Sequence, residues 1–391
     1  MKNITLLLII FIVLTCSCNF SNKSGFEKYQ ALLREEFKKI DTLHIDDAHK
    51  PKNIKYSEAI ESPDLSLDIE FIKLETKPEA LIGYVGNIMH DDGKIFICDN
   101  KYHSLYIFAD DGHFIHRIHN VGNGPKEYNK LTDFTLDKKK KRIVLYDAQK
   151  KTYYYYKYDG TFIESKRFGL WFREFCITPA GNYLLYTNNG NRSGFRLFQT
   201  DSSGINITKK ALPWNGYYKM NMYATPHIER YKDETLISYP FSNAIYIVKN
   251  NSIDCKYQLD FNGNEFRYDW ENHPGYHNFQ NLFKQSDKEF YYIGNFIEND
   301  EFALFPIETK EIRKDMTLAY NKKTGKTLKV KLKYPDSDLY INPQFTFSKK
   351  FAGSIYAYEI IEYELDKKYK ELKDIHEDDN PCLVLFSIKN I

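Results

Sequence analysis

Residues 93–118, GKIFICDNKYHSLYIFADDGHFIHRI, decide the fold of this chain. Two runs rich in Ile, Phe, Leu and Tyr are separated by a polar turn, and Asp-Asp-Gly then leads into a third run. Gly and Asn tolerate a positive φ, so clusters of such residues between apolar runs are typical of hairpin turns. The stretch therefore predicts three consecutive antiparallel strands.

The first part of this unit recurs along the chain. A turn followed by an apolar run appears as GKIFICD, KRIVLYD, GNYLLYT, DETLISY, DEFALFP and GSIYAYE. The intervals between equivalent residues are 48, 40, 52, 67 and 53, counted at Ile95, Ile143, Tyr183, Thr235, Phe302 and Ile355. Four-stranded propeller blades take about 40 to 50 residues each. The repeat predicts an all-β fold, a six-bladed β-propeller of four-stranded blades with short accessory helices.

The sixth copy lacks one strand. After IYAYE we expect a helix over residues 361–375, where five apolar residues share one helical face, and then a single strand, CLVLFSIKNI. Residues 65–75, LSLDIEFIKLE, are a spare strand near the N-terminus. We expect this strand to complete the last blade, because closing the ring removes an exposed sheet edge.

The N-terminal residues indicate export. Residues 4–15, ITLLLIIFIVLT, follow Lys2 and form an apolar run shorter than the roughly 20 residues of a spanning helix. The run suits a secretory signal, and Ser17-Cys18 resembles a bacterial lipoprotein cleavage box, with Cys16 as the competing site. We expect lipidation at Cys18 and a membrane-anchored, periplasm-facing envelope protein. Plain secretion and an uncleaved anchor are the alternatives.

The expected domain order follows from these segments. Residues 1–17 are the signal peptide, 18–64 hold a tether, a short helix and an extended connector, and 65–391 form one propeller domain. The helix is expected over 25–40, where apolar residues share one face. It is interpreted as a spacer packed on the propeller, with a partner-binding or membrane-surface helix as the alternative.

Composition excludes several classes of function. The chain has 55 Lys and Arg against 53 Asp and Glu, so nothing in its charge favours nucleic acid. Its cysteines form no CxxC or Cys/His cluster, so a zinc site is not expected. There is no GxSxG or HExxH motif, and the Asp-Asp-Gly turns lack the spacing of a calcium loop. No catalysis is indicated.

The stretch HNVGNGPKEYNKLTDFTLD, residues 119–137, is the segment that could be taken for a phosphate-binding loop. Gly122-x-Gly124-Pro125 has no third Gly of a dinucleotide fingerprint and no Gly-Lys-Ser/Thr of a P-loop, and a strand-like alternation follows it. We interpret this loop as a joint between blades that carries no ligand, with Asp133 at its far end facing the channel.

Two sets of residues are candidates for binding. Polar residues that open the innermost strands should line the channel: Asn87, Asp133, Glu174, His227 and Gln344. They line either a water-filled channel or a site for a small ligand or calcium. Aromatic residues in long loops would suit sugar rings or peptides, or else fill gaps between blades: Trp171, Trp214, Tyr217, Trp270 and Tyr276.

Several motifs resemble a known family. LETKPE, DDGKIFICDN, IFADDGHFI, GNGPKEY and the ending EDDNPCLVLFSIK are similar to a family of bacterial six-bladed β-propeller lipoproteins with NHL-like repeats. The likeness is strong over about residues 65–165 and at the C-terminus, and it fades across 170–340. The resemblance implies a secreted, lipid-anchored propeller and no particular reaction.

We therefore favour an envelope lipoprotein that binds a small molecule, glycan, peptide or protein partner, without a cofactor. The alternative hypothesis is a calcium-assisted hydrolase or lyase that works in the channel, and a structural assembly subunit is a third.

Overall fold

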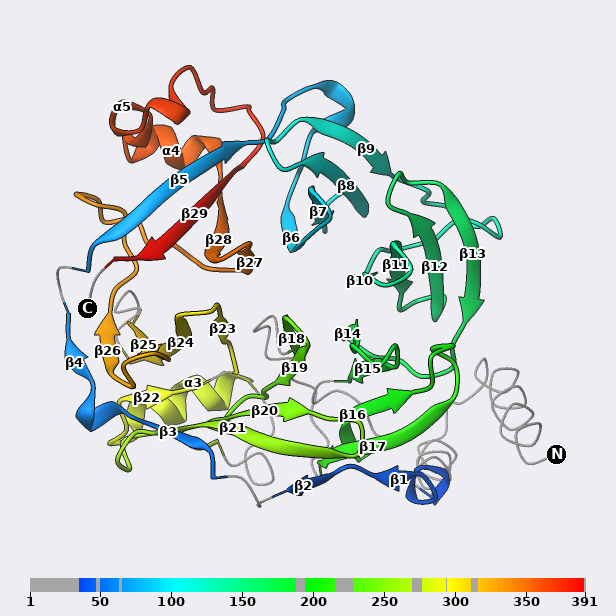
Figure 1. Cartoon of the computed structure of the whole chain (residues 1–391), viewed down its shortest axis with the longest axis horizontal. Helices are drawn as coiled ribbons and strands as arrows, with labels where there is room; N and C mark the ends of the chain where they lie inside the picture. Colours follow the sequence, from blue (N-terminus) through cyan, green and yellow to red (C-terminus); the bar gives the residue numbers. More distant parts are fainter. Residues whose placement is uncertain are drawn as a thin grey trace.

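The computed structural model describes residues 35–46, 50–62, 65–187, 194–214, 228–268, 276–292, 294–310 and 316–389. Six sheets surround a central axis as the blades of a ring (Figure 1). The predicted six-bladed β-propeller is confirmed. Within each blade, antiparallel neighbours follow outward from an innermost strand.

The first three blades follow the chain directly. Blade one consists of β6 (Val85–Asp91), β7 (Lys94–Asp99), β8 (Ser104–Ala109) and β9 (Phe114–Ile118). Blade two consists of β10 (Asp133–Asp137), β11 (Arg142–Asp147), β12 (Thr152–Lys157) and β13 (Phe162–Arg167). Blade three consists of β14 (Glu174–Ile177), β15 (Tyr183–Tyr186), β16 (Phe195–Thr200) and β17 (Ile207–Pro213).

The other three blades complete the ring. Blade four consists of β18 (Ile228–Tyr231), β19 (Glu234–Ile237), β20 (Ala244–Val248) and β21 (Ser252–Asp260). Blade five consists of β22 (Phe290–Tyr291), β23 (Ile297–Glu298), β24 (Phe302–Thr309), β25 (Met316–Asn321) and β26 (Thr327–Val330). Blade six consists of β27 (Phe345–Phe347), β28 (Lys350–Ile355), β29 (Cys382–Ile388) and β5 (Leu67–Lys73).

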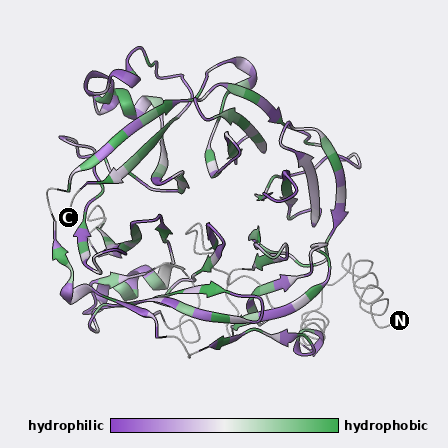
Figure 2. Ribbon diagram, in the orientation of Figure 1, coloured by the Kyte–Doolittle hydropathy of each residue, from purple (hydrophilic) through white to green (hydrophobic). Residues whose placement is uncertain are grey.

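Burial on both faces explains why the middle strands read as unbroken apolar runs. One hydrophobic cluster fills each seam between neighbouring blades. Strand β7 is therefore buried at every position from Ile95 to Asp99, and β11 from Ile143 to Asp147. Hydrophobic residues follow the strands in Figure 2, and hydrophilic ones gather at the turns.

The N-terminal strand closes the ring, as predicted. β5 pairs antiparallel with β29, from Leu67 opposite Ile388 to Lys73 opposite Cys382. Phe71 is buried in the seam between blades five and six, with its ring centroid 6.1 Å from that of Tyr334 and 4.9 Å from that of Tyr369. The N-terminal strand β5 and the last strand, β29, thus share blade six.

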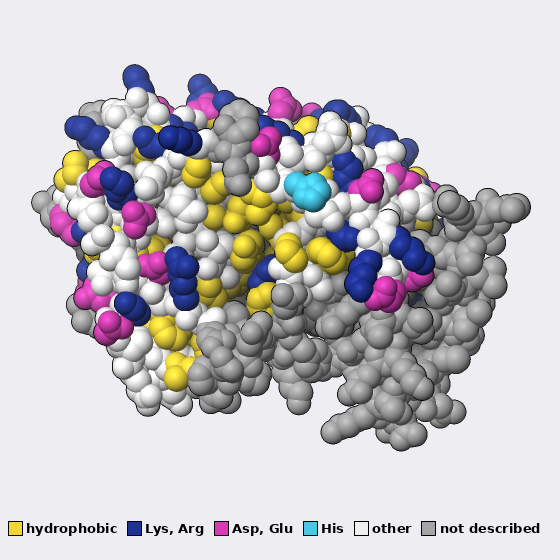
Figure 3. Space-filling model, turned by 90° about the horizontal axis from the view of Figure 1, so that it is seen from below, with side chains coloured by type: hydrophobic (Ala, Val, Ile, Leu, Met, Phe, Trp, Pro, Cys, Tyr) yellow, Lys and Arg dark blue, Asp and Glu magenta, His cyan; other side chains and the backbone are white. Residues whose placement is uncertain are grey.

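A belt of four short strands precedes this closing strand. β1 (Asp41–Thr42), β2 (His44–Asp46), β3 (Lys52–Lys55) and β4 (Ile60–Glu61) pair in parallel with the outermost strands of blades three, four and five. A 3₁₀ turn (Tyr56–Glu58) separates β3 from β4. The view of this side in Figure 3 shows hydrophobic side chains gathered between charged margins. Ile45 and Ile60 of the belt are exposed, whereas Ile54 of β3 and Leu43, between β1 and β2, are buried in the hydrophobic clusters of the blades. Backbone pairing and these two side chains therefore attach the belt.

The structure also has short helical segments beside the blade strands. A helical turn spans residues 35–38, and the rest of the helix expected over 25–40 lies outside the described residues. Between blades four and five lies α3 (Tyr276–Gln285), and a 3₁₀ turn (Pro78–Ala80) precedes β6. None of the helices in the described part of the chain has the length and apolar character needed to cross a bilayer.

The expectation of one helix over 361–375 is wrong. The structure has α4 (Ala357–Glu362), α5 (Leu365–Lys368) and a 3₁₀ turn (Lys370–Leu372) instead. Glu364 interrupts the helix because its φ of 55° lies in the left-handed region. Leu365, Leu372 and Ile375 are nevertheless buried against blades five and six, as their spacing predicts.

Candidate functional site

The glycine loop of residues 119–132 is occupied by its own side chains. The backbone N–H of Gly124 donates to Glu127 Oε2 over 2.7 Å, and a Cβ on Gly122 would lie 2.1 Å from the same oxygen. Tyr128, almost fully buried, donates from its hydroxyl to the carbonyl of His103 over 2.8 Å. The loop therefore surrounds a carboxylate of its own and joins blades one and two.

Three of the residues nominated for the channel come together. Asp133 opens β10 and is 8% exposed. Its Oδ1 accepts a hydrogen bond from Asn87 Nδ2 on β6 over 3.3 Å, and its Oδ2 accepts one from the backbone N–H of Phe175 on β14 over 3.0 Å. Glu174, also buried, precedes Phe175. One carboxyl group thus links the innermost strands of blades one, two and three.

Burial raises the pKa of Asp133 to about 8, and the charge of Glu174 adds to the rise. The hydrogen bonds from Phe175, Phe134 and Asn87 oppose this shift of the pKa but do not offset it. Near neutral pH, Asp133 therefore holds its proton for much of the time.

A second channel carboxyl was not predicted. Burial, followed by the charge of Glu298, raises the pKa of Glu229 to about 8, and Lys138 lowers it. Glu229 lies on β18 of blade four, whereas Lys138 belongs to the first hairpin of blade two, so the carboxyl lies toward the channel. The predicted residue of this blade, His227, lies outside the described residues.

The channel does not assemble a metal site from the residues that can be described. Among these, no three His, Cys, Asp or Glu side chains are placed to hold one ion. The calcium hypothesis therefore has no ligand set within the described ranges.

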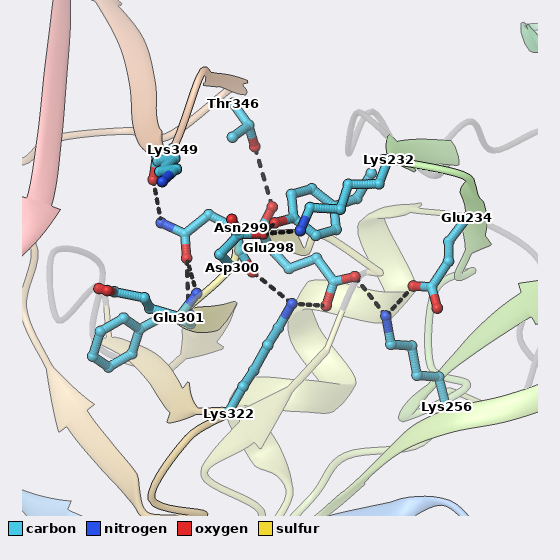
Figure 4. A network of polar contacts seen from close by, with 12 residues as sticks. Lys232, Glu234, Lys256, Glu298, Asn299, Asp300, Glu301, Lys322, Thr346 and Lys349 are labelled. Atoms are coloured by element: carbon cyan, nitrogen blue, oxygen red, sulfur yellow. Dashed lines mark hydrogen bonds and ion pairs between the residues drawn. The ribbon is translucent and has the colours of Figure 1, made fainter.

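An ionic network joins blades four, five and six at the inner hairpins (Figure 4). Its centre is Glu298 on β23, which is fully buried. Glu298 pairs with Lys256 Nζ at 2.6 Å and with Lys322 Nζ at 2.8 Å, and it accepts from the hydroxyl of Tyr257 at 2.8 Å. Lys256 also pairs with Glu234.

The hairpin that follows Glu298 extends this network. Asn299 Nδ2 donates to the carbonyl of Lys349 in blade six over 2.9 Å, and the Asn299 Oδ1 accepts from the backbone of Phe302 over 2.8 Å. Asp300 pairs with Lys232 of blade four. Because each of these groups has a partner within the chain, the network serves to fix the blades relative to one another.

The structure describes the surroundings of two of the predicted aromatic loop residues, Trp171 and Trp214. Trp171 is half-buried between β13 and β14, and Trp214 packs against the cluster of Tyr268 and Phe279. The Arg196 guanidinium lies 3.9 Å from the centroid of the Trp214 ring. Tyr217 and Trp270 lie outside the described residues. Tyr276 opens α3, and its side chain is not among those described.

A pocket opens at the seam between blades six and one. It has a volume of about 240 Å³. Its walls come from the segment before β6, the connection between β26 and β27, and the end of β28 with the first turn of α4. The lining residues are Tyr84, Val85, Tyr334, Leu339, Tyr340, Asn342, Gln344, Ser354, Ile355, Tyr356, Tyr358 and Glu359. Of the sequence candidates whose side chains the structure describes, Gln344 is the one that lines this pocket.

Aromatic rings are exposed on the rim of this pocket. Tyr84 is 57% exposed and Tyr358 is 52% exposed. Tyr356 stacks on Tyr358, with ring centroids 5.7 Å apart and planes 20° apart. Burial, followed by the neighbouring Tyr84 hydroxyl among other groups, raises the pKa of Tyr356, whose hydroxyl accepts the Val85 N–H over 3.1 Å. Tyr84 before β6 and the two tyrosines at the start of α4 thus lie together at the pocket.

Polar groups of the pocket are held in place. Ser354 Oγ donates to Gln344 Oε1 over 2.9 Å, and the Gln344 N–H donates to the carbonyl of Ala352 over 2.7 Å. Glu359 Oε2 accepts the backbone N–H of Tyr356 over 3.0 Å, which caps α4. The side chains that could contact a ligand are therefore oriented before it arrives.

Asp99 positions the loop that carries Tyr84. This fully buried carboxylate accepts four backbone N–H groups, from Gly83 at 2.7 Å, Tyr84 at 3.2 Å, Lys101 at 2.7 Å and Tyr102 at 3.1 Å. Asp147 does the same in blade two for Asn129, Lys130, Gln149 and Lys150. The Asp that ends the repeated strand motif is thus a loop-organising residue in both blades.

Comparisons with known proteins agree with this architecture. A family model described as "Domain of unknown function (DUF4934)" matches residues 40–387. No curated protein matches the chain in sequence.

Two solved structures from Bacteroides are similar in fold. A "Putative exported protein" from Bacteroides fragilis is 21% identical with a TM-score of 0.74, over 87% of this chain and 100% of the other. A DUF4221 family member from Bacteroides vulgatus is 11% identical with a TM-score of 0.51, over 84% of this chain and 99% of the other. At such identities the likeness concerns the fold alone.

Proposed function

The chain belongs to the DUF4934 family, and because that family has no assigned activity we propose its function from the site: an exported, membrane-tethered protein that binds a ligand in the tyrosine pocket between blades six and one. The observation that carries this proposal is the exposure of Tyr84 and Tyr358 on the rim of a preformed pocket. Exposed hydrophobic residues that are scattered singly are ordinary, whereas exposed aromatic side chains gathered at one pocket are typical of a binding site.

The scaffold supports a binding role. Asp99, the cap of α4 and the Ser354–Gln344 hydrogen bond fix the pocket walls on a closed ring. A rigid site avoids part of the entropy that ordering would otherwise cost upon binding. Binding alone requires no nucleophile or metal, which agrees with the lack of a catalytic motif in the sequence.

We test this proposal with the full-length chain, purified in detergent, on combined glycan and peptide arrays. Tyr84→Ala and Tyr358→Ala should each weaken retention of any specific probe by about tenfold. Tyr363→Ala is the matched control, because Tyr363 is an exposed tyrosine of the same helical segment that does not line the pocket. Equal retention by all three variants would contradict the assignment of the pocket.

The tether is proposed from the sequence. Residues 4–15 followed by Ser17-Cys18 fit a lipoprotein signal, and the NHL-like lipoproteins that the chain resembles share this arrangement. Cys18→Ser should abolish incorporation of an alkyne-bearing fatty acid and release the protein from the membrane fraction. Cys16→Ser should leave both unchanged, and the reverse result would move the anchor to Cys16.

A further inference from the structure

From the chemistry of the pocket walls we infer that the ligand is a neutral carbohydrate, with one sugar ring seated between Tyr84 and Tyr358. This inference rests on the proposed function and names its ligand class. It follows from the charge, the hydrogen-bonding groups, the aromatic surfaces and the size of the pocket.

The charge of the walls disfavours an anionic ligand. Among the described residues that line the pocket there is no Lys or Arg. Lys333 approaches one wall, 4.9 Å from the centroid of the Tyr340 ring, but it pairs with Asp338 at 2.9 Å. A phosphate or carboxylate buried here would lack a counter-charge, and binding an unpaired charge is costly. Nucleotides and acidic sugars are therefore poor ligands.

The single acidic side chain already has a structural role. Glu359 is the only charged residue among the lining residues that the structure describes, and its Oε2 caps the first turn of α4 through the Tyr356 N–H. A capping carboxylate can be replaced by an amide, because Gln also occurs at this position of a capping box. An amine or quaternary ammonium ligand would use this carboxylate as its counter-charge, whereas a neutral ligand needs none.

The other polar groups both donate and accept hydrogen bonds. Asn342, Gln344 and Ser354 are uncharged, and Ser354 occupies the Gln344 Oε1, so the Gln344 Nε2 hydrogens remain as donors. Sugar hydroxyls need partners of both kinds, and amides with hydroxyls supply them. This set of groups matches a polyol better than a purely apolar ligand.

The aromatic surfaces match the flat face of a sugar ring. Tyr358 is backed by Tyr356 on one face and is half exposed overall. A pyranose has C–H groups on its faces and hydroxyls around its edge, so a tyrosine with an apolar face and a polar tip is complementary to it. At about 240 Å³ the pocket lies just below the roughly 300–1,000 Å³ of drug-sized sites, which suits a single ring.

The test compares neutral glycans, amine-bearing glycans, polyamines and peptides on one array with the full-length chain. We expect neutral glycans to be retained, with a loss of about tenfold in Tyr84→Ala and in Tyr358→Ala. Retention by Tyr363→Ala should stay within about threefold of the parent. Thermal melting of each variant identifies any that fails to fold, and Tyr358→Phe keeps the ring where Tyr358→Ala is unstable.

The outcomes separate the ligand class from the site. If only amines or peptides bind, and the tyrosine variants lose them, the carbohydrate inference is overturned while the pocket stands. Absence of any glycan hit counts against the inference, and indifference of every hit to Tyr84 and Tyr358 overturns the proposed function itself.

Discussion

The Asp133 carboxyl group of blade two accepts a hydrogen bond from the backbone N–H of Phe175 in blade three, over 3.0 Å. Phe175 lies on β14, an innermost strand that has a sheet neighbour on only one side. Backbone groups on the channel edge of such a strand need partners from elsewhere. Asp133 supplies one for blade three and, through Asn87, contacts blade one as well.

The first prediction is that Asp133 makes stability depend on pH. Its folded-state pKa of about 8 lies above the ordinary value of 3.8. A raised folded-state pKa means that stability present at low pH is lost as the pH rises from about 4 to about 8. We expect the free energy of unfolding to fall between pH 5 and pH 8, and Asp133→Asn to reduce that fall by about 3 kcal/mol.

Urea unfolding at the two pH values measures this effect. The absolute stability of Asp133→Asn is not the readout, because its new amide can face the Asn87 Nδ2 donor. Glu229→Gln should flatten the same pH range, since the pKa of Glu229 is also raised to about 8. If the slope in Asp133→Asn equals that of the parent, the proton is not on this group.

The second prediction concerns ring closure at Gly112. Its φ is 91°, and a Cβ there would lie 2.0 Å from the carbonyl oxygen of Lys73 on the closing strand β5. Gly93 has a φ of 69° and no atom within 4 Å of the same position. Gly93→Ala should cost about 1–2 kcal/mol of stability from backbone strain alone. Gly112→Ala should cost more, because the closing strand must also move.

Thermal or urea unfolding of the two variants provides the comparison. The excess for Gly112→Ala is expected to be at least about 1 kcal/mol. Equal losses of stability in the two variants would mean that the contact with Lys73 is relieved without a measurable free-energy cost. Ring closure would then not depend on Gly112.

The third prediction concerns the attachment of the segment that leads into the belt. Lys210 is buried, and its Nζ donates to the carbonyls of Phe37 at 2.6 Å, Lys38 at 3.0 Å and Ile40 at 2.7 Å. The Phe37 carbonyl also accepts the Ile40 N–H over 3.2 Å. Lys210→Met should remove the ammonium donor from all three carbonyls, so residues 35–43 should exchange amide hydrogen about tenfold faster while the blades stay protected.

Lys209→Met is the control for this experiment. Lys209 precedes Lys210 on β17, but its Nζ donates to the Asn250 carbonyl at 2.8 Å, in blade four. Faster exchange of residues 35–43 in both variants, or in neither, would contradict the assignment to Lys210.

Particular residues show what the sequence could predict. The blades were predictable because strands buried on both faces, such as β7 and β11, appear as unbroken apolar runs. The closing strand was predictable because the sixth repeat lacks one strand and residues 65–75 supply a spare one. The belt strands carry little apolar signal, since all of β2 is exposed and its pairing is through the backbone. The interruption of the C-terminal helix depends on the left-handed conformation of Glu364, which no periodicity reveals.

The candidate site was less predictable for a geometric reason. Asn87, Asp133 and Glu174 could be nominated because each occupies the same place in its blade. The pocket combines Tyr84, Gln344 and Tyr358, which are far apart in sequence and become neighbours only when blade six meets blade one. Of these, only Gln344 was signalled by its position before a strand.

The fourth prediction uses the internal repeat to separate stability from binding. Asp99 and Asp147 end equivalent strands, and each accepts four backbone N–H groups. Asn at either position turns one acceptor into a donor, so Asp99→Asn and Asp147→Asn should each lose about 1–3 kcal/mol of stability. Only Asp99 fixes the backbone of Gly83 and Tyr84, so only Asp99→Asn should loosen the pocket.

Hydrogen exchange of residues 81–86 reports on the pocket without a ligand. We expect that segment to exchange about tenfold faster in Asp99→Asn, and residues 127–131 to do so in Asp147→Asn. Retention of array-bound probes should fall only in Asp99→Asn, although both variants are similarly destabilised. If Asp147→Asn reduced retention equally, binding would follow global stability, and Tyr84 would not need a fixed backbone to hold its ligand.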